Sequence, residues 1–226
     1  MGIQVQGNSG VIQEVDSTFR AAHAVAKSAE YGALGHYRVS VTTGTIAAAL
    51  AAGAQLFQFK WTDATRFAVV TKIHARFLPL TPFTAATLTD HTSLDAVIAR
   101  PFAAGGGGTT LTLTGNNAKL RTSMASSLAT INVATTAALT LATGLDAQPF
   151  VQNIRKGNRV NPASATEEVI QPTVDWLDFS PRIDASEHPL VFAQNEGFVI
   201  RNRTVWPAAG TGIYLFEVSW AEVTAY

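Results

Sequence analysis

Apolar and polar residues alternate over several segments of the chain, and this alternation predicts β-strands. The odd-numbered residues from Phe67 to Phe77 are expected on one face of a strand and the even-numbered ones on the other. Successive side chains of a strand point to opposite sides of a sheet, so this pattern is typical of a strand with one buried face. We expect Pro79 and Pro82 to end the strand, because proline cannot donate a ladder hydrogen bond.

The segment from Gly212 to Val223 shows the clearest alternation. Four large residues share one of its faces: Tyr214, Phe216, Val218 and Trp220. Burial of each contributes about 1.5–3 kcal/mol before conformational entropy is subtracted. We therefore expect a central strand of a sheet here, with Trp220 in the core.

Further strands are predicted throughout the chain. They are Tyr37–Thr42, Gln55–Trp61, Asp95–Arg100, Thr109–Thr114, Thr140–Ala147, Val174–Phe179, Leu190–Ala193 and Phe198–Val205. Glycine, asparagine and proline separate these short strands, which favours antiparallel sheets over a parallel βαβ arrangement. The sequence predicts an all-β fold, a single-domain antiparallel β-sandwich of jelly-roll-like type.

Residues 37–226 are expected to form this sandwich, and residues 1–36 an extended N-terminal arm. Three stretches are ambiguous between helical and extended structure: Ser17–Ser28, Thr45–Ala52 and Lys119–Ala138. The run Gly105–Gly108 is interpreted as a long hairpin or a loop tip whose ends are close in space.

Composition changes the picture of the surface. Charged residues make up only 14% of the 226 residues, against roughly 25% in a usual soluble domain. A surface so poor in charge is weakly protected against association, so we expect other subunits to cover much of it. Sixteen basic residues balance sixteen acidic ones, which argues against a nucleic-acid partner because no broad basic field faces the phosphates.

Cysteine is absent, which excludes disulfides, thiolate metal sites and cysteine nucleophiles. The N-terminus shows no basic start followed by an apolar run, so no secretory signal is predicted. The longest apolar stretch, Ile46 to Ala54, is too short to span a bilayer. We expect a soluble protein made in a cytoplasm, with no membrane partner.

Candidate chemistry is sparse, and we expect no catalytic residue, no cofactor and no metal. Ser9 lies between glycines but lacks the surroundings of a serine nucleophile. The five histidines show no ligand spacing. A third hypothesis is a hydrolase that uses a glycosidase-like pair of acids. The candidate carboxylates are Glu167, Glu168, Asp175 and Asp178.

Other residues are candidates for contact with a partner. Arg155, Lys156 and Arg159 form the densest basic patch, for which a solvated loop is the simplest interpretation. Trp206 precedes a proline and a glycine-rich turn, and it is the best candidate for an exposed or interfacial aromatic residue. Such an aromatic, or Trp61, is expected in any glycan-binding groove.

Several segments of the chain resemble a group of tailed-bacteriophage virion proteins. These segments are Glu14–Arg20, Glu30–Tyr37, Pro79–Thr84, Gln194–Asn202 and Val218–Val223. The resemblance covers most of the chain but carries no catalytic signature. It implies a head-associated cement or decoration protein seated on the major capsid protein, with a jelly-roll or related fold and often a trimeric state.

The leading hypothesis is therefore a non-enzymatic protein of the virion, made in the cytoplasm of the host bacterium, that decorates and stabilises a capsid. Its candidate contact residues in the arm are Phe19, Arg20, Tyr31 and His36. An arm of this kind buries a large area for its length when it docks. The alternative is a tail, baseplate or fibre component that binds glycans of the host surface.

Overall fold

The computed structural model describes residues 35–81, 93–153, 188–206 and 208–224, with the backbone of short strands at 5–6, 12–13, 159–160, 167–168 and 175–178. The chain divides into two compact units, Met1–Glu30 and Tyr31–Tyr226. In the first unit, β1 (Val5–Gln6) pairs with β2 (Ile12–Gln13) in antiparallel orientation. The described part of the second unit contains strands and no helix.

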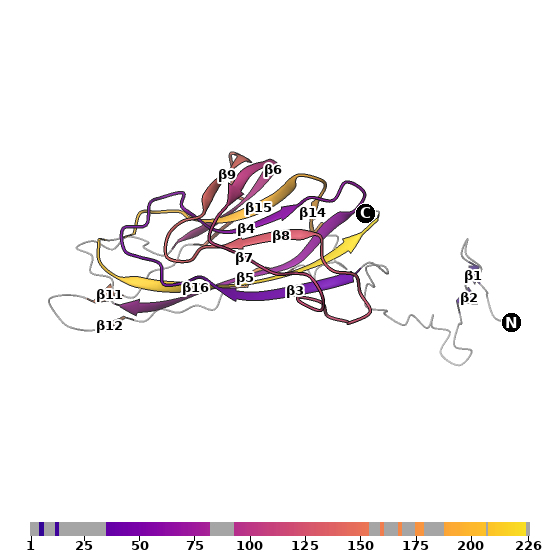
Figure 1. The fold of residues 1–226 in the computed structure, drawn as a ribbon, viewed down its shortest axis with the longest axis horizontal. Coiled ribbons are helices and arrows are strands. Elements are labelled where there is room, and N and C mark those ends of the chain that lie inside the picture. Colours follow the sequence, from indigo (N-terminus) through magenta and orange to yellow (C-terminus); the bar gives the residue numbers. More distant parts are fainter. Residues whose placement is uncertain are drawn as a thin grey trace. The chain divides into compact units, whose positions relative to one another are not determined.

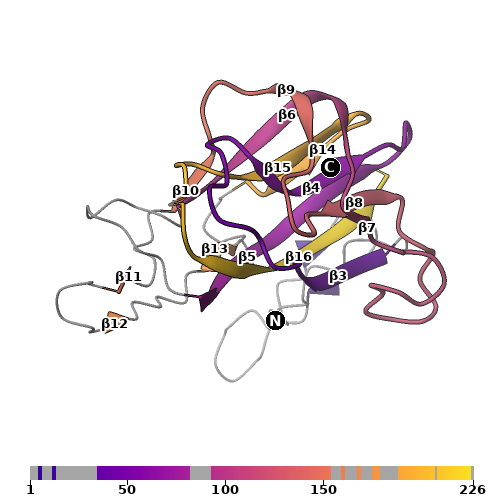
Figure 2. The ribbon, with the colours of Figure 1, turned by 60° about the vertical axis from the view of Figure 1, so that its left-hand side comes forward.

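Two large antiparallel sheets make up most of the described part of the second unit (Figure 1, Figure 2). The seven-stranded sheet has the order β10-β6-β15-β4-β8-β7, with β9 paired to β6. Its strands are β4 (Gln55–Trp61), β6 (Leu94–Gly106), β7 (Thr109–Thr110), β8 (Ala129–Val133), β9 (Thr140–Leu145), β10 (Val151–Asn153) and β15 (Glu196–Asn202).

The five-stranded sheet has the order β13-β5-β16-β3, with β14 also paired to β5. Its strands are β3 (Gly35–Thr42), β5 (Phe67–Thr81), β13 (Asp175–Asp178), β14 (Leu190–Phe192) and β16 (Thr211–Val223). A separate pair joins β11 (Arg159–Val160) to β12 (Glu167–Glu168). The predicted all-β antiparallel sandwich is confirmed, while the jelly-roll topology stays a prediction.

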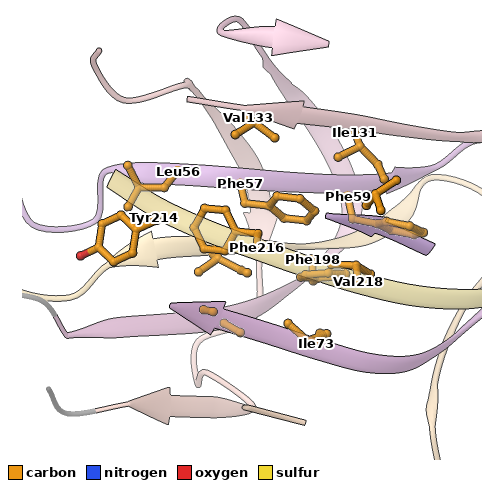
Figure 3. Packing of buried hydrophobic residues seen from close by; sticks show 14 of the residues in the cluster. Leu56, Phe57, Phe59, Ile73, Ile131, Val133, Phe198, Tyr214, Phe216 and Val218 are labelled. Carbon is orange, nitrogen blue, oxygen red and sulfur yellow. The ribbon is translucent and has the colours of Figure 1, made fainter. Parts of the chain in front are cut away.

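Large aromatic residues from both sheets meet in one core. Figure 3 shows Phe57 of β4 beside Phe216 of β16. The rings of Phe57 and Phe216 lie 5.3 Å apart between centroids, and those of Phe59 and Trp220 lie 5.5 Å apart, edge to face. Aromatic pairs at this spacing are worth about 0.5–1.5 kcal/mol beyond the area they bury. These contacts hold the two sheets together.

Strand β16 behaves as the alternation predicts. Tyr214, Phe216, Val218 and Trp220 are fully buried. The strand pairs with β5 along one side and with β3 along the other, so it lies inside its sheet. The prediction of a central core strand is confirmed.

Strand β5 departs from the predicted single face. Ile73 and Phe77 point into the main core, but Val69 packs in a second cluster with Ala221 and Val223. The cause is a β-bulge: Ser219 pairs with Lys72 and Trp220 with Val70, which leaves Thr71 without a counterpart. An extra residue in one strand reverses the alternation beyond it. The Thr71 hydroxyl donates to the Ser219 carbonyl at 3.3 Å.

The expectation that Pro79 ends this strand is wrong, because β5 continues to Thr81. In the described part of the chain, only β16 pairs with β5 at Pro79, opposite Gly212. A residue without an N–H is tolerated where one side of the strand lacks a ladder partner. A register shift between Thr211 and Gly212 further loosens the pairing there.

The remaining predicted strands are all present, and all except β4 have one or both ends shifted. The ambiguous stretch Lys119–Ala138 contains β8, an interior strand beside β4. Thr45–Ala52 forms no helix, and Ile46 makes an isolated bridge to Gly212. The first strand of the sandwich begins at Gly35, two residues before the predicted start of the domain at Tyr37.

Candidate functional site

The second half of β6 and the whole of β9 form a flap over the outer face of the seven-stranded sheet. Ala103 pairs with Thr143 and Gly106 with Thr140. Figure 2 shows β6 and β9 side by side, next to β15. Below the flap, Ala142 packs in a small apolar cluster with Val199, a residue of β15. The flap thus gives part of this sheet a second buried face.

The glycine run crosses the sheet rather than forming a hairpin. Gly106 pairs with β9, whereas the next strand, β7, pairs only with β8, so the hairpin interpretation is wrong. All four glycines have positive φ, between 59° and 114°, a region that residues with a side chain avoid. At Gly108 a Cβ would lie 2.2 Å from the carbonyl oxygen of Val133. Glycine is therefore required for this close crossing.

Two buried glutamines of β4 hold the flap. The Gln58 amide donates to the Thr140 carbonyl at 2.8 Å and to Gln55 Oε1 at 2.6 Å, and its own oxygen accepts from the Gly106 N–H at 2.8 Å. Gln55 exchanges two hydrogen bonds with the backbone of Ala142. Buried amides need such partners, because an unpaired one costs about 1–3 kcal/mol.

An open groove of about 370 Å³ lies beside the flap and the glycine run. Its floor is the outer face of β4 and β8, and its lining includes Lys60, Phe102, Thr110, Thr130 and Asn132. The Lys60 ammonium lies 5.8 Å from the centre of the Phe102 ring, within the range of a cation–π contact. Sequence analysis missed this groove, although the alternation of β4 already assigns Lys60 to the face opposite the core.

A buried carboxylate lies at the far end of β16. Glu222 is fully buried, and its Oε1 accepts from Ser127 Oγ at 2.7 Å and from the Leu128 N–H at 3.1 Å. Burial raises the pKa of Glu222, although these hydrogen bonds favour the ionised form. Burial, together with the nearby Glu222 charge, raises the pKa of Tyr37 to about 12. Glu222 thus fastens the loop before β8 to the core.

The solvent side of the five-stranded sheet has a polar end. Glu217 of β16 lies 3.2 Å from the Arg38 guanidinium and 3.5 Å from the His74 ring, one on each neighbouring strand. It also accepts from the Ser40 hydroxyl at 3.3 Å. Cross-strand pairs of this kind stabilise a sheet modestly.

The other end of the same side is mainly apolar, although the exposed Arg76 lies opposite Leu215. Four residues, which we call the apolar strip, define it: Leu78, Leu80, Ile213 and Leu215. Leu78 and Leu80 are each 49% exposed, and Leu78 lies opposite Ile213 in the pairing of β5 with β16. Exposed apolar side chains that gather in this way mark contact surfaces more often than isolated ones do.

The predicted interface residues are only partly within the described part of the chain. Phe19, Arg20, Tyr31, Arg155 and Lys156 lie outside the described residues. Arg159 lies in β11, where only the backbone is described.

His36 lies on the edge strand β3, which the protein's own loop covers. Its carbonyl accepts from the Leu120 N–H at 3.2 Å, and its N–H donates to the Met124 sulfur at 3.2 Å. Burial lowers the pKa of the His36 ring. A contact between His36 and a partner stays a prediction.

The expectation that Trp206 is exposed is wrong. The residue is only 2% exposed, and its ring packs against Phe77 and Tyr214 at centroid distances of 5.7 and 5.9 Å. The backbone N–H of Trp206 donates to the Leu50 carbonyl at 2.9 Å and ties this part of the chain to the preceding loop. Trp61 is also fully buried, so neither tryptophan lines a groove.

The candidate acids of the hydrolase hypothesis lie in β12 and β13, whose side chains are not described, and Ser9 lies outside the described residues. Within the described ranges, no group of three or more His, Cys, Asp or Glu residues is placed to hold a metal ion. The same ranges include no helix that is long and apolar enough to cross a membrane.

Comparison of the chain with protein-family models, with curated proteins and with solved structures finds no match. The functional conclusion therefore depends on the chemistry of the surfaces described above and on the resemblance of the quoted segments.

Proposed function

We propose that the protein is a non-enzymatic structural component of a tailed-phage virion that binds the major capsid protein and stabilises the shell. The observation that carries the proposal is the apolar strip, which a β-sandwich in isolation leaves in water. Covering exposed apolar surface is favourable by about 25 cal/mol per Å². A capsid shell presents the same partner surface at many symmetry-related positions, so several weak contacts can add up to strong binding.

Two further features support this function. Charged residues are only 14% of the chain, which suits a protein whose surface is largely covered by other subunits. The segments that resemble phage virion proteins include Pro79–Thr84, which begins inside β5, directly after Leu78, and contains Leu80. The proposed assembly includes self-association, with a trimer favoured by the same resemblance.

The test is binding to capsid particles assembled from the major capsid protein of the same phage. Leu78→Glu places a charge in the apolar strip, and since Leu78 is half exposed the fold should survive. The matched control is Leu141→Glu, because Leu141 is 55% exposed on the flap. We expect the first variant to lose particle binding in a co-sedimentation assay and the second to bind as the wild type does.

Deletion of residues 1–30 tests the arm separately. The deletion ends where the first compact unit ends, and we expect an unchanged thermal transition with loss of particle binding. Undiminished binding by the shortened protein would disprove a role for the arm. Undiminished binding by Leu78→Glu would disprove a role for the apolar strip.

A further inference from the structure

The groove beside the glycine run contains one charged residue, Lys60, which lies on the outer face of β4 and is half-buried. Several cations of the two sheets have acidic partners: Arg38 pairs with Glu217, and Arg201 with Asp95. Within the described residues no ion pair is found for Lys60, and its ammonium lies over the Phe102 ring. A partly desolvated cation without an anion favours an anionic ligand.

The rest of the lining fits a ligand rich in hydroxyl groups. Thr110 Oγ1 accepts from the Asn132 amide at 2.7 Å, which leaves its own proton for a ligand acceptor. The Thr130 side chain lies on the same floor and is exposed. Backbone of Gly105–Gly107 forms one wall, without side chains that would keep a ligand away.

The groove offers little to an apolar ligand. Phe102 is only 3% exposed, because its ring is buried in the cluster under the flap. The groove volume of about 370 Å³ is at the lower end of the range for small-molecule sites. It therefore suits a small polar molecule rather than an apolar side chain or a lipid.

We infer that this groove binds a carboxylated sugar of the uronic-acid class. The carboxylate lies against the Lys60 ammonium, and the ring hydroxyls exchange hydrogen bonds with Thr110, Thr130 and the glycine backbone. The site is on the seven-stranded sheet, whereas the apolar strip is on the five-stranded sheet, so this inference goes beyond the proposed capsid contact and does not depend on it.

The test is a titration of the full chain, followed by protein NMR, with three probes: glucuronate, glucose and acetate. Glucuronate shares its ring with glucose and its carboxylate with acetate. We expect glucuronate to bind at least about tenfold more tightly than either, since a hydrogen bond to a charged group is worth roughly that factor. Binding should also weaken as salt rises.

Lys60→Met removes the charge and keeps the apolar stem. The matched control is Lys72→Met, since Lys72 is also half-buried but lies on the five-stranded sheet. We expect Lys60→Met to lose the preference for glucuronate over glucose, with an unchanged thermal transition, and Lys72→Met to keep it. Equal affinity for glucuronate and glucose, equal affinity for glucuronate and acetate, no glucuronate binding, or full preference in Lys60→Met would each overturn the inference.

Discussion

The buried carboxylate of Glu222 makes the stability of the sandwich depend on pH in a defined direction. Its side chain is fully buried, and Oε2 has no hydrogen-bond partner in the described part of the chain. Since burial raises the pKa of Glu222, the folded protein holds a proton that the unfolded chain releases. The free energy of unfolding therefore falls as pH rises from the ordinary pKa of a glutamate to the raised pKa in the fold.

The magnitude follows from the linkage between protonation and folding. Each unit by which the folded pKa exceeds the unfolded one removes about 1.4 kcal/mol from the free energy of unfolding once the pH is above both. Glu222→Gln removes the titration and keeps an acceptor oxygen for Ser127 Oγ and the Leu128 N–H. We therefore expect the wild type to lose stability relative to Glu222→Gln as pH rises above the ordinary pKa of a glutamate, about 4.

The assay is urea unfolding of both proteins across this pH range, with the difference in free energy plotted against pH. Ser127→Ala adds an independent check, because the Ser127 hydroxyl donates to the ionised carboxylate and its loss should raise the pKa of Glu222 further. In this variant the decline should extend to higher pH and be larger in total than in the wild type. A flat difference between wild type and Glu222→Gln, or one that favours the wild type at high pH, would refute the reasoning.

Two further predictions concern a buried tryptophan next to an exposed valine, and a glycine that packs against the backbone of a neighbouring strand. Trp206→Ala should lower the free energy of unfolding by about 3–5 kcal/mol, because it opens a cavity beside Phe77. Val205→Ala is the control: this residue is 59% exposed, so its replacement should change stability by less than about 0.5 kcal/mol. Equal effects of the two variants would contradict the inward position of the indole. Gly197→Ala places a Cβ 2.0 Å from the carbonyl oxygen of Phe59. The overpacking should cost about 1–3 kcal/mol and lower the temperature of thermal unfolding. An unchanged unfolding temperature would contradict this prediction.

Most of the strands could be predicted because one face of each lies in the common core, which makes apolar and polar residues alternate along the strand. β4 follows the predicted bounds of Gln55–Trp61 at both ends. The bulge at Thr71 could not be predicted, because it depends on the register between β5 and β16 and not on either strand alone. β8 was ambiguous because it is short and lies in a tract of Ala, Ser and Thr that favours neither helix nor strand decisively.

Trp206 shows why local context misled the prediction of exposure. A tryptophan beside a proline and a glycine-rich turn is typical of a surface loop, but the backbone bond from Trp206 to Leu50 ties this loop against the core. That contact joins residues more than 150 positions apart. No pattern within a few residues of Trp206 records it.

The groove could not be predicted from the sequence, because its residues come from four strands and none of them is distinctive by itself. Lys60, Thr110 and Asn132 have no distinctive sequence pattern around them, and the crossing of the glycine run over β4 is what makes them one surface. The same crossing requires positive φ, so the run constrains the groove wall as well as the chain path. Because the apolar strip lies on the other sheet, a charge in the strip and the loss of charge at Lys60 should have separable effects. Loss of both activities in either single variant would indicate a fold defect rather than two sites.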